Sequence, residues 1–162
     1  MSHLRAIASA LLLMPAAASS ASMDVTPVQS LDVSRYMGSW HEIAAIPQFF
    51  QRKCVRDTRA TYSLDPGQPL IIVENVCTRD DGGKERVLGR ARPVEGQAAS
   101  RLEVTFLDLF GEYRFWVAAD YWVIALDPQY RWAVVGHPPR RHGRALSRAP
   151  RPAPGVLPAP AG

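Results

Sequence analysis

Signatures of enzyme active sites are missing from this chain of 162 residues. It contains no Gly-x-Ser-x-Gly nucleophile elbow, no His-Glu-x-x-His zinc helix and no phosphate-binding loop. His41 and Glu42 are adjacent, but neighbours on a strand point to opposite faces and do not reach one substrate. We therefore predict no catalytic residue, no cofactor and no enzymatic activity.

Long apolar runs are also missing. The mostly apolar run near the N-terminus, residues 6–18, is shorter than the roughly 20 residues that a membrane-spanning helix needs. Arg5 precedes this run and the small residues Ser19, Ser20 and Ala21 follow it, which is the pattern of a secretory signal peptide. We predict that residues 1–21 are a signal peptide and that residues 22–30 are a linker.

Cysteine is scarce, since Cys54 and Cys77 are the two in the chain. Neither directly follows the apolar run, where a bacterial lipoprotein carries its lipid-bearing cysteine, so lipid anchoring is not predicted. An even pair of cysteines in an oxidising compartment is typical of a disulfide, and without a matching histidine cluster it makes a poor zinc site. We predict an exported protein with one disulfide and no metal.

The formal net charge of +4 comes from one end of the chain. The arginines that produce it are Arg140, Arg141, Arg144, Arg148 and Arg151. The middle of the sequence mixes both signs, and without the C-terminal arginines the chain would be close to neutral. We therefore do not predict a nucleic-acid partner.

Alternating apolar and polar residues run through most of the chain at roughly 10-residue spacing, which is typical of antiparallel strands joined by turns. The predicted strands are residues 38–44, 58–64, 70–78, 84–92, 101–106, 121–126, 131–137 and a weak 143–148. A short helical turn capped by Asp32 or Ser34 precedes them. The pattern predicts an all-β barrel or sandwich, and eight strands can close a barrel wide enough for one small ligand.

Four motifs occur in the order and spacing of a known family. They are YMGSWHEIA at 36–44, ATYSL at 60–64, DYWVIALD at 120–127 and LSRAP at 146–150. Over residues 31–150 the chain resembles the lipocalins, most closely their bacterial outer-membrane type. The resemblance implies an eight-stranded antiparallel up-and-down barrel over residues 31–148, with an apolar calyx, and export to the periplasm.

Several residue roles follow from the same resemblance. Gly38 would turn the chain into the first strand, Trp40 would plug the closed end of the barrel, and Arg148 would lie across the ring of Trp40. Cys54 would precede the second strand and Cys77 would end the third, so that their disulfide ties the barrel mouth.

Period-2 geometry then selects side chains that face the calyx. The predicted ligand-binding residues are Glu42, Ala44, Tyr62, Val73, Asn75, Phe106, Tyr121 and Val123. For each of them ordinary core packing is an open alternative, and Glu42 would need a buried partner or a raised pKa. The aromatic connection at 107–116 would either form a rim for acyl chains or a membrane surface, or cap the barrel.

The C-terminal part departs from the family pattern. Residues 142–145 read HGRA where bulky apolar residues are usual, and a Pro/Ala-rich tail at 149–162 stands where an amphipathic helix usually packs. We therefore expect a weak eighth strand, poor barrel closure, no C-terminal helix and an extended or disordered tail. A frameshift in the coding sequence is one hypothesis for this composition.

The expected function is binding of a small hydrophobic ligand, such as a fatty acid or lysophospholipid, for storage or transport, with a role in the cell envelope. An enzyme that modifies a lipid or isoprenoid in the same cavity is an alternative, and a defective truncated lipocalin is another. Peripheral contact with a membrane surface is a further expectation, and the sequence does not determine the oligomeric state.

Overall fold

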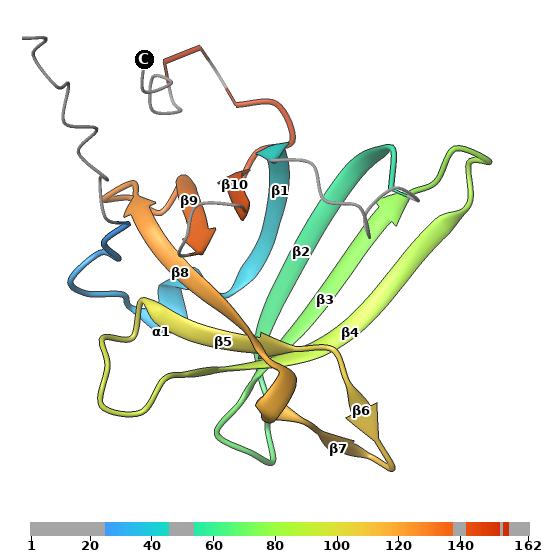
Figure 1. Cartoon of the computed structure of the whole chain (residues 1–162). Helices are drawn as coiled ribbons and strands as arrows, with labels where there is room; N and C mark the ends of the chain where they lie inside the picture. The colour runs from blue at the N-terminus through green and yellow to red at the C-terminus, as the bar shows by residue number, and fades with distance from the viewer. Residues whose placement is uncertain (1–24, 46–53, 138–141, 153, 156–162) are drawn as a thin grey trace, which may run out of the picture.

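Eight strands form one closed barrel in the computed structural model, which describes residues 25–45, 54–137, 142–152 and 154–155 (Figure 1). They are β1 (Gly38–Ala45), β2 (Arg56–Leu64), β3 (Ile71–Thr78), β4 (Lys84–Pro93), β5 (Arg101–Thr105), β8 (Ala119–Leu126), β9 (Trp132–His137) and β10 (His142–Ser147). All neighbours are antiparallel, in the order β1-β10-β9-β8-β5-β4-β3-β2. The predicted up-and-down barrel is confirmed, and the sandwich alternative is wrong. The predicted signal peptide lies outside the described residues.

The last strand is complete despite its unusual composition. All six residues of β10 pair with β9, and residues from Arg144 to Ser147 also pair with β1. Gly143 lies opposite Gly136, so the two positions without a side chain face each other. The expectation of poor closure is therefore wrong, because the backbone ladder forms whatever the side chain at these positions.

Two smaller elements were not expected from the sequence. The connection between β5 and β8 contains a hairpin of β6 (Asp108–Leu109) and β7 (Glu112–Tyr113), followed by a short 3-10 helix, η2 (Phe115–Val117). Figure 1 shows the hairpin projecting from the barrel. Phe110 and Gly111 form its tip with φ of +59° and +81°, a left-handed turn that the alternation pattern does not reveal.

The chain enters the barrel through a short helix, α1 (Val33–Tyr36), at the closed end. Asp32 caps it by accepting a hydrogen bond from the backbone N–H of Arg35 at 3.1 Å. Upstream, the backbone N–H of Val28 donates to the carbonyl of Val123 at 2.8 Å, and the Val28 carbonyl accepts from Ser100. The described part of the predicted linker is therefore attached to the barrel.

Trp40 fills the closed end, where none of its surface is exposed. Its indole N–H donates to the carbonyl of Tyr36 at 2.8 Å, and the two rings lie 4.9 Å apart. The guanidinium of Arg148 lies 3.8 Å from the centre of the indole ring. This cation-π stack joins the start of β1 to the end of β10, far apart in sequence.

The same guanidinium bonds three backbone carbonyls. It donates to Arg35 at 2.7 Å, to Ser39 at 3.1 Å and to Tyr130 at 3.3 Å. Gly38 makes room for it: the residue has φ of +96°, and a Cβ there would lie 3.0 Å from Nη1 of Arg148. Glycine therefore suits both the backbone turn and the close approach of the arginine.

The Arg148→Met variant should lower the free energy of unfolding by about 3 kcal/mol, because it removes the cation-π contact and leaves three carbonyls without their donor. Urea unfolding followed by tryptophan fluorescence measures this loss. Arg101→Met is the matched control, since Arg101 stacks on the ring of Trp122 at 4.4 Å but has no comparable set of carbonyl bonds. The control should lose less than about 1 kcal/mol, and equal losses would contradict the central role of Arg148.

Candidate ligand-binding calyx

The inner face of the barrel follows from strand register. Residues directly opposite each other in an antiparallel pair point to the same side. Ala60, Asn75 and Val87 are opposite one another on β2, β3 and β4, and Tyr62, Val73 and Gly89 form the next such row. Ala60, Tyr62 and Val73 belong to the buried core, so both rows face the interior.

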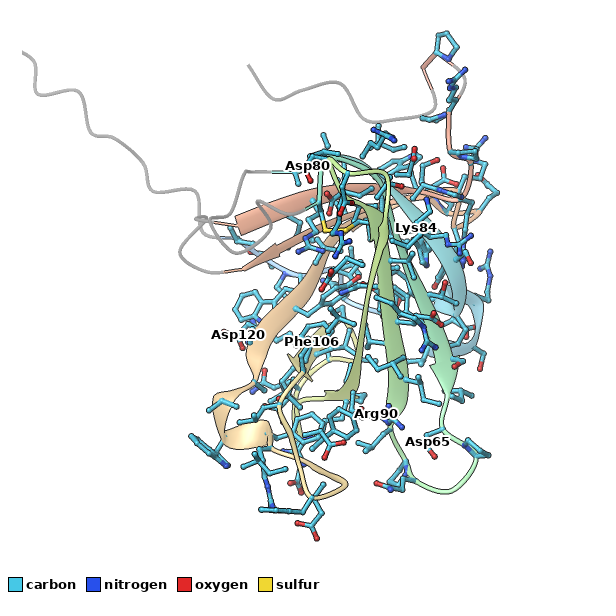
Figure 2. All side chains as sticks on the ribbon, turned by 90° about the vertical axis from the view of Figure 1, so that its right-hand side faces the viewer. Asp65, Asp80, Lys84, Arg90, Phe106 and Asp120 are labelled. Atoms are coloured by element: carbon cyan, nitrogen blue, oxygen red, sulfur yellow. A yellow bond between two sulfur atoms is a disulfide. The ribbon has the colours of Figure 1, made fainter. Side chains whose placement is uncertain are left out.

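Part of this inner face is open. Val87 keeps 41% of its surface exposed and Phe106 keeps 44%, although both lie on the interior side. Phe106 directly follows β5, and a Cβ on the inward-facing Gly89 would lie 2.6 Å from its ring (Figure 2). Water therefore reaches apolar side chains on the interior side of the barrel.

Four of the eight predicted ligand contacts form two pairs that differ in exposure. Val73 and Val123 are packed in the core with exposures of 2% and 0%. Asn75 and Phe106 lie nearer the open part, together with Val87, which the period-2 pattern does not single out. Val73 and Val123 therefore belong to the core, and contact of any of these residues with a ligand stays a prediction.

Ala44 was expected to share the inner face with Glu42, and this is wrong. A bulge in β1 shifts the register, so Glu42 is opposite Leu146 but Ala44 is opposite Ala145. Ala45, opposite Arg144, takes the inward position instead. A bulge adds one residue to one strand and reverses the alternation beyond it, which no period-2 count anticipates.

Three tyrosine hydroxyls meet above Trp40. The hydroxyl of Tyr121 lies 2.8 Å from that of Tyr36 and 2.9 Å from that of Tyr62. Burial raises the pKa of all three phenols, so they remain protonated near neutral pH. The three hydroxyls carry three protons, and the two hydrogen bonds between them use two of these. One hydroxyl proton is therefore not donated within this triad.

An ion pair lies on the same inner face. Arg144 is opposite the buried Val135, and its Nε is 3.4 Å from Oε2 of Glu42. The two side chains are 25% and 15% exposed. Burial raises the pKa of Glu42, and the charge of Arg144 acts in the opposite direction.

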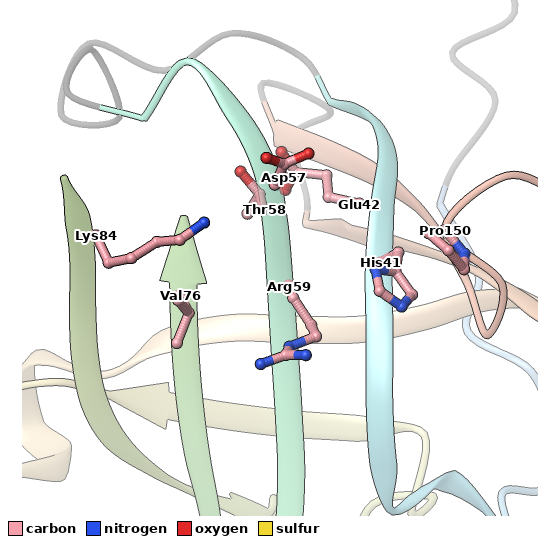
Figure 3. A pocket seen from close by; sticks show the side chains of 8 residues that line it. All are labelled: His41, Glu42, Asp57, Thr58, Arg59, Val76, Lys84 and Pro150. Carbon is pink, nitrogen blue, oxygen red and sulfur yellow. The ribbon is translucent and has the colours of Figure 1, made fainter. Parts of the chain in front are cut away.

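A separate pocket of about 410 Å³ lies on the outer wall (Figure 3). His41, Arg59 and Val76 line it from three neighbouring strands and are opposite one another in register, on the side away from Trp40. Beyond His41 and Arg59, β1 and β2 are no longer paired, and Glu42 borders the pocket at this split.

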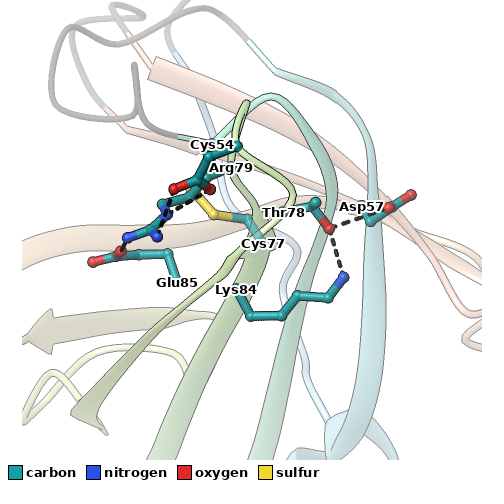
Figure 4. The surroundings of a disulfide bond; sticks show 8 residues. Cys54, Asp57, Cys77, Thr78, Arg79, Lys84 and Glu85 are labelled. Carbon is teal, nitrogen blue, oxygen red and sulfur yellow. Dashed lines mark hydrogen bonds and ion pairs between the residues drawn. A yellow bond between two sulfur atoms is a disulfide. The ribbon is translucent and has the colours of Figure 1, made fainter.

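The disulfide between Cys54 and Cys77 is confirmed, with 5.5 Å between the two Cα atoms (Figure 4). Beside it, Thr78 donates to Asp57 at 3.3 Å and accepts from the ammonium of Lys84 at 2.6 Å. Together these contacts connect the start of β2 to the end of β3 and the start of β4.

A protein-family profile described as a lipocalin-like domain matches residues 31–154, most of the chain. The chain belongs to the lipocalin family. The family predicted from the four sequence motifs is therefore confirmed, and the calyx and closed end described above are those of a lipocalin barrel.

Relatives of this lipocalin occur in plants and bacteria. Temperature-induced lipocalin-1 of Arabidopsis thaliana is 37% identical over 125 residues, which cover 75% of this chain and 64% of the plant protein. Outer membrane lipoprotein Blc of Escherichia coli K12 is 36% identical over 126 residues, which cover 78% of this chain and 67% of Blc. The chain thus spans about two thirds of the length of these two relatives.

Solved structures agree on the fold. Insecticyanin from the tobacco hornworm Manduca sexta superimposes with a TM-score of 0.62, covering 79% of this lipocalin and 69% of that chain. Its identity is 24%, so the likeness concerns the barrel alone.

Two polar groups of the interior were missed by sequence reasoning. The sequence predicts Tyr36 only as part of a short helical turn and Arg144 only as part of a weak strand. Arg144 could have been found, because it precedes the buried Leu146 by two residues on one strand and therefore shares its face. The tyrosine triad could not, because its three members come from α1, β2 and β8.

Within the described ranges, no three or more His, Cys, Asp or Glu side chains are grouped so as to hold a metal ion. No helix of that same part of the chain has the length and apolar character to cross a membrane.

Proposed function

We propose that this lipocalin carries a small apolar molecule, such as a single-chain lipid, in its calyx. The observation that carries the proposal is the exposure of Val87 and Phe106 on the inner face of the barrel. Burying an apolar tail against such side chains stabilises a complex by roughly 25 cal/mol for each Å² removed from water, less the cost of ordering the tail. Transport or storage of such a ligand in the cell envelope is part of the proposal.

We also propose that the protein is exported to the periplasm. The disulfide between Cys54 and Cys77 supports an oxidising compartment, and the relative named outer membrane lipoprotein Blc supports the cell envelope. The segment at 1–21 would direct the export.

A membrane surface is the second proposed partner. Apolar side chains are exposed along the β5–β8 connection, with Phe110 at 102%, Trp116 at 77%, Val117 at 44% and Leu109 at 39%. Phe110 stands at the tip of the projecting β6–β7 hairpin, where it contributes nothing to the core. Exposed aromatic and apolar side chains on a protruding element suit shallow insertion between lipid head groups.

Displacement of the neutral dye N-phenyl-1-naphthylamine measures ligand binding in the calyx. The Val87→Trp variant should weaken dye and fatty-acid binding at least about tenfold, because a bulky ring at this inward position fills the open interior. Leu88→Trp is the matched control: Leu88 is the next residue, 39% exposed, and faces outward opposite Glu74. Equal losses in both variants, or no dye binding by the wild type, would contradict the proposal. Conversion of the lipid during incubation would point to the enzyme alternative.

Cell fractionation tests the proposed export. The tagged full-length chain should appear in the periplasmic fraction with Cys54 and Cys77 oxidised, as shown by their resistance to thiol alkylation. Recovery in the cytoplasm with both thiols free would contradict it.

Vesicle flotation tests the proposed membrane contact. The Phe110→Ser/Trp116→Ser double variant should bind phosphatidylglycerol-containing vesicles at least about fivefold less than the wild type, because two large apolar side chains no longer insert. Leu64→Ser is the control, since Leu64 is 56% exposed but belongs to β2. Unchanged flotation of the double variant would rule out this surface.

A further inference from the structure

A calyx that binds only apolar tails has no use for an ion pair such as Glu42–Arg144 on its inner face. Moving two charges out of water has a large cost, which their attraction offsets only when further hydrogen bonds satisfy the remaining donors and acceptors. Oε2 of Glu42 is buried, lies 3.4 Å from Arg144 Nε and has no hydrogen-bond partner among the described residues. An apolar residue at 144, between inward neighbours such as Val135 and Leu146, would avoid this cost. The pair is therefore a candidate for a role in binding.

The guanidinium of Arg144 lies on the interior side. Its positive charge lowers the pKa of both Tyr62 and Tyr121, against the larger effect of burial, so its field reaches the tyrosine triad. The triad keeps one unused hydroxyl donor. Donors from Arg144 and from the triad thus border the same interior, where Glu42 supplies the acceptor.

An anionic group of a ligand, such as a carboxylate, would accept hydrogen bonds from these donors. The guanidinium is planar and presents parallel N–H groups that match the oxygens of a carboxylate or a phosphate. Charge-assisted hydrogen bonds of this kind gain strength where water is excluded. In the pair as it stands, Glu42 holds Arg144 without good hydrogen-bond geometry, so a better-placed anion can replace it.

We infer that the calyx selects single-chain amphiphiles with an anionic head group, a carboxylate or a phosphate, and that this head group takes Arg144 from Glu42. The inference rests on the proposed calyx function and adds the residues that bind the head group. Arg144 is then a specificity-determining residue, and Glu42 is a built-in competitor that keeps the guanidinium in place when the calyx is empty.

Dye displacement by three ligands with the same tail tests the inference: dodecanoate, dodecyl phosphate and dodecanol. The wild type should prefer at least one of the two anions to dodecanol by about tenfold, the value of one charge-assisted hydrogen bond. The two anionic arms distinguish a carboxylate ligand from a phosphate ligand. Arg144→Met should abolish the preference, because affinity for the favoured anion should fall to about that for dodecanol.

The Glu42→Gln variant makes the test sharper, because its effect should have the opposite sign. With the competing carboxylate removed, the anion should bind several-fold more tightly than to the wild type. An ion pair with only a structural role would instead lose binding in both single variants. The Glu42→Gln/Arg144→Met double variant removes both charges of the pair, so it remains informative if Arg144→Met fails to fold. It should bind all three ligands alike.

Arg59→Met is the matched control, since it removes the same charge from the outer face opposite Val76; it should keep the wild-type preference. Equal binding of all three ligands by the wild type would overturn the head-group inference while the calyx function stands. Absence of dye and ligand binding altogether would overturn both.

Discussion

The stack of Arg148 on Trp40 is the contact on which the rest of the barrel depends. Closing a barrel requires the first and last strands to meet in one register, and this contact holds both at the closed end. The arginine lies 3.8 Å from the ring centre and bonds carbonyls from α1, β1 and the β8–β9 turn. Because the arginine has five N–H donors in one plane, a single residue can stack and bond all three at once.

Away from this stack, the wall of the barrel is held by other contacts. The start of β2 is fastened to β3 by the disulfide, whereas β5 pairs with β4 over only four positions and then leaves the wall. The chain that leaves forms the β6–β7 hairpin, whose apolar residues stay exposed.

Polarity inside the barrel is layered. Trp40 forms the apolar floor, the tyrosine triad lies above it, and the Glu42–Arg144 pair borders the triad. The layers differ in how completely their polar groups are hydrogen-bonded. The indole N–H of Trp40 has an acceptor, whereas one hydroxyl proton of the triad is not donated within it. Oε2 of Glu42 has no hydrogen bond to a described residue. Unsatisfied groups deep in a protein cost free energy, so their position marks where a ligand would contribute most.

The sequence by itself determined the family, the strand alternation, the disulfide and the residues of the closed end, because these depend on short motifs and on the fixed period of a strand. Only the tertiary structure decided the rest. The bulge that turns Ala44 outward, the β6–β7 hairpin and the meeting of Tyr36, Tyr62 and Tyr121 depend on register between strands and on contacts across the barrel. A local pattern specifies which residues alternate, but the side that each one faces is set by the partner strand, which lies elsewhere in the chain.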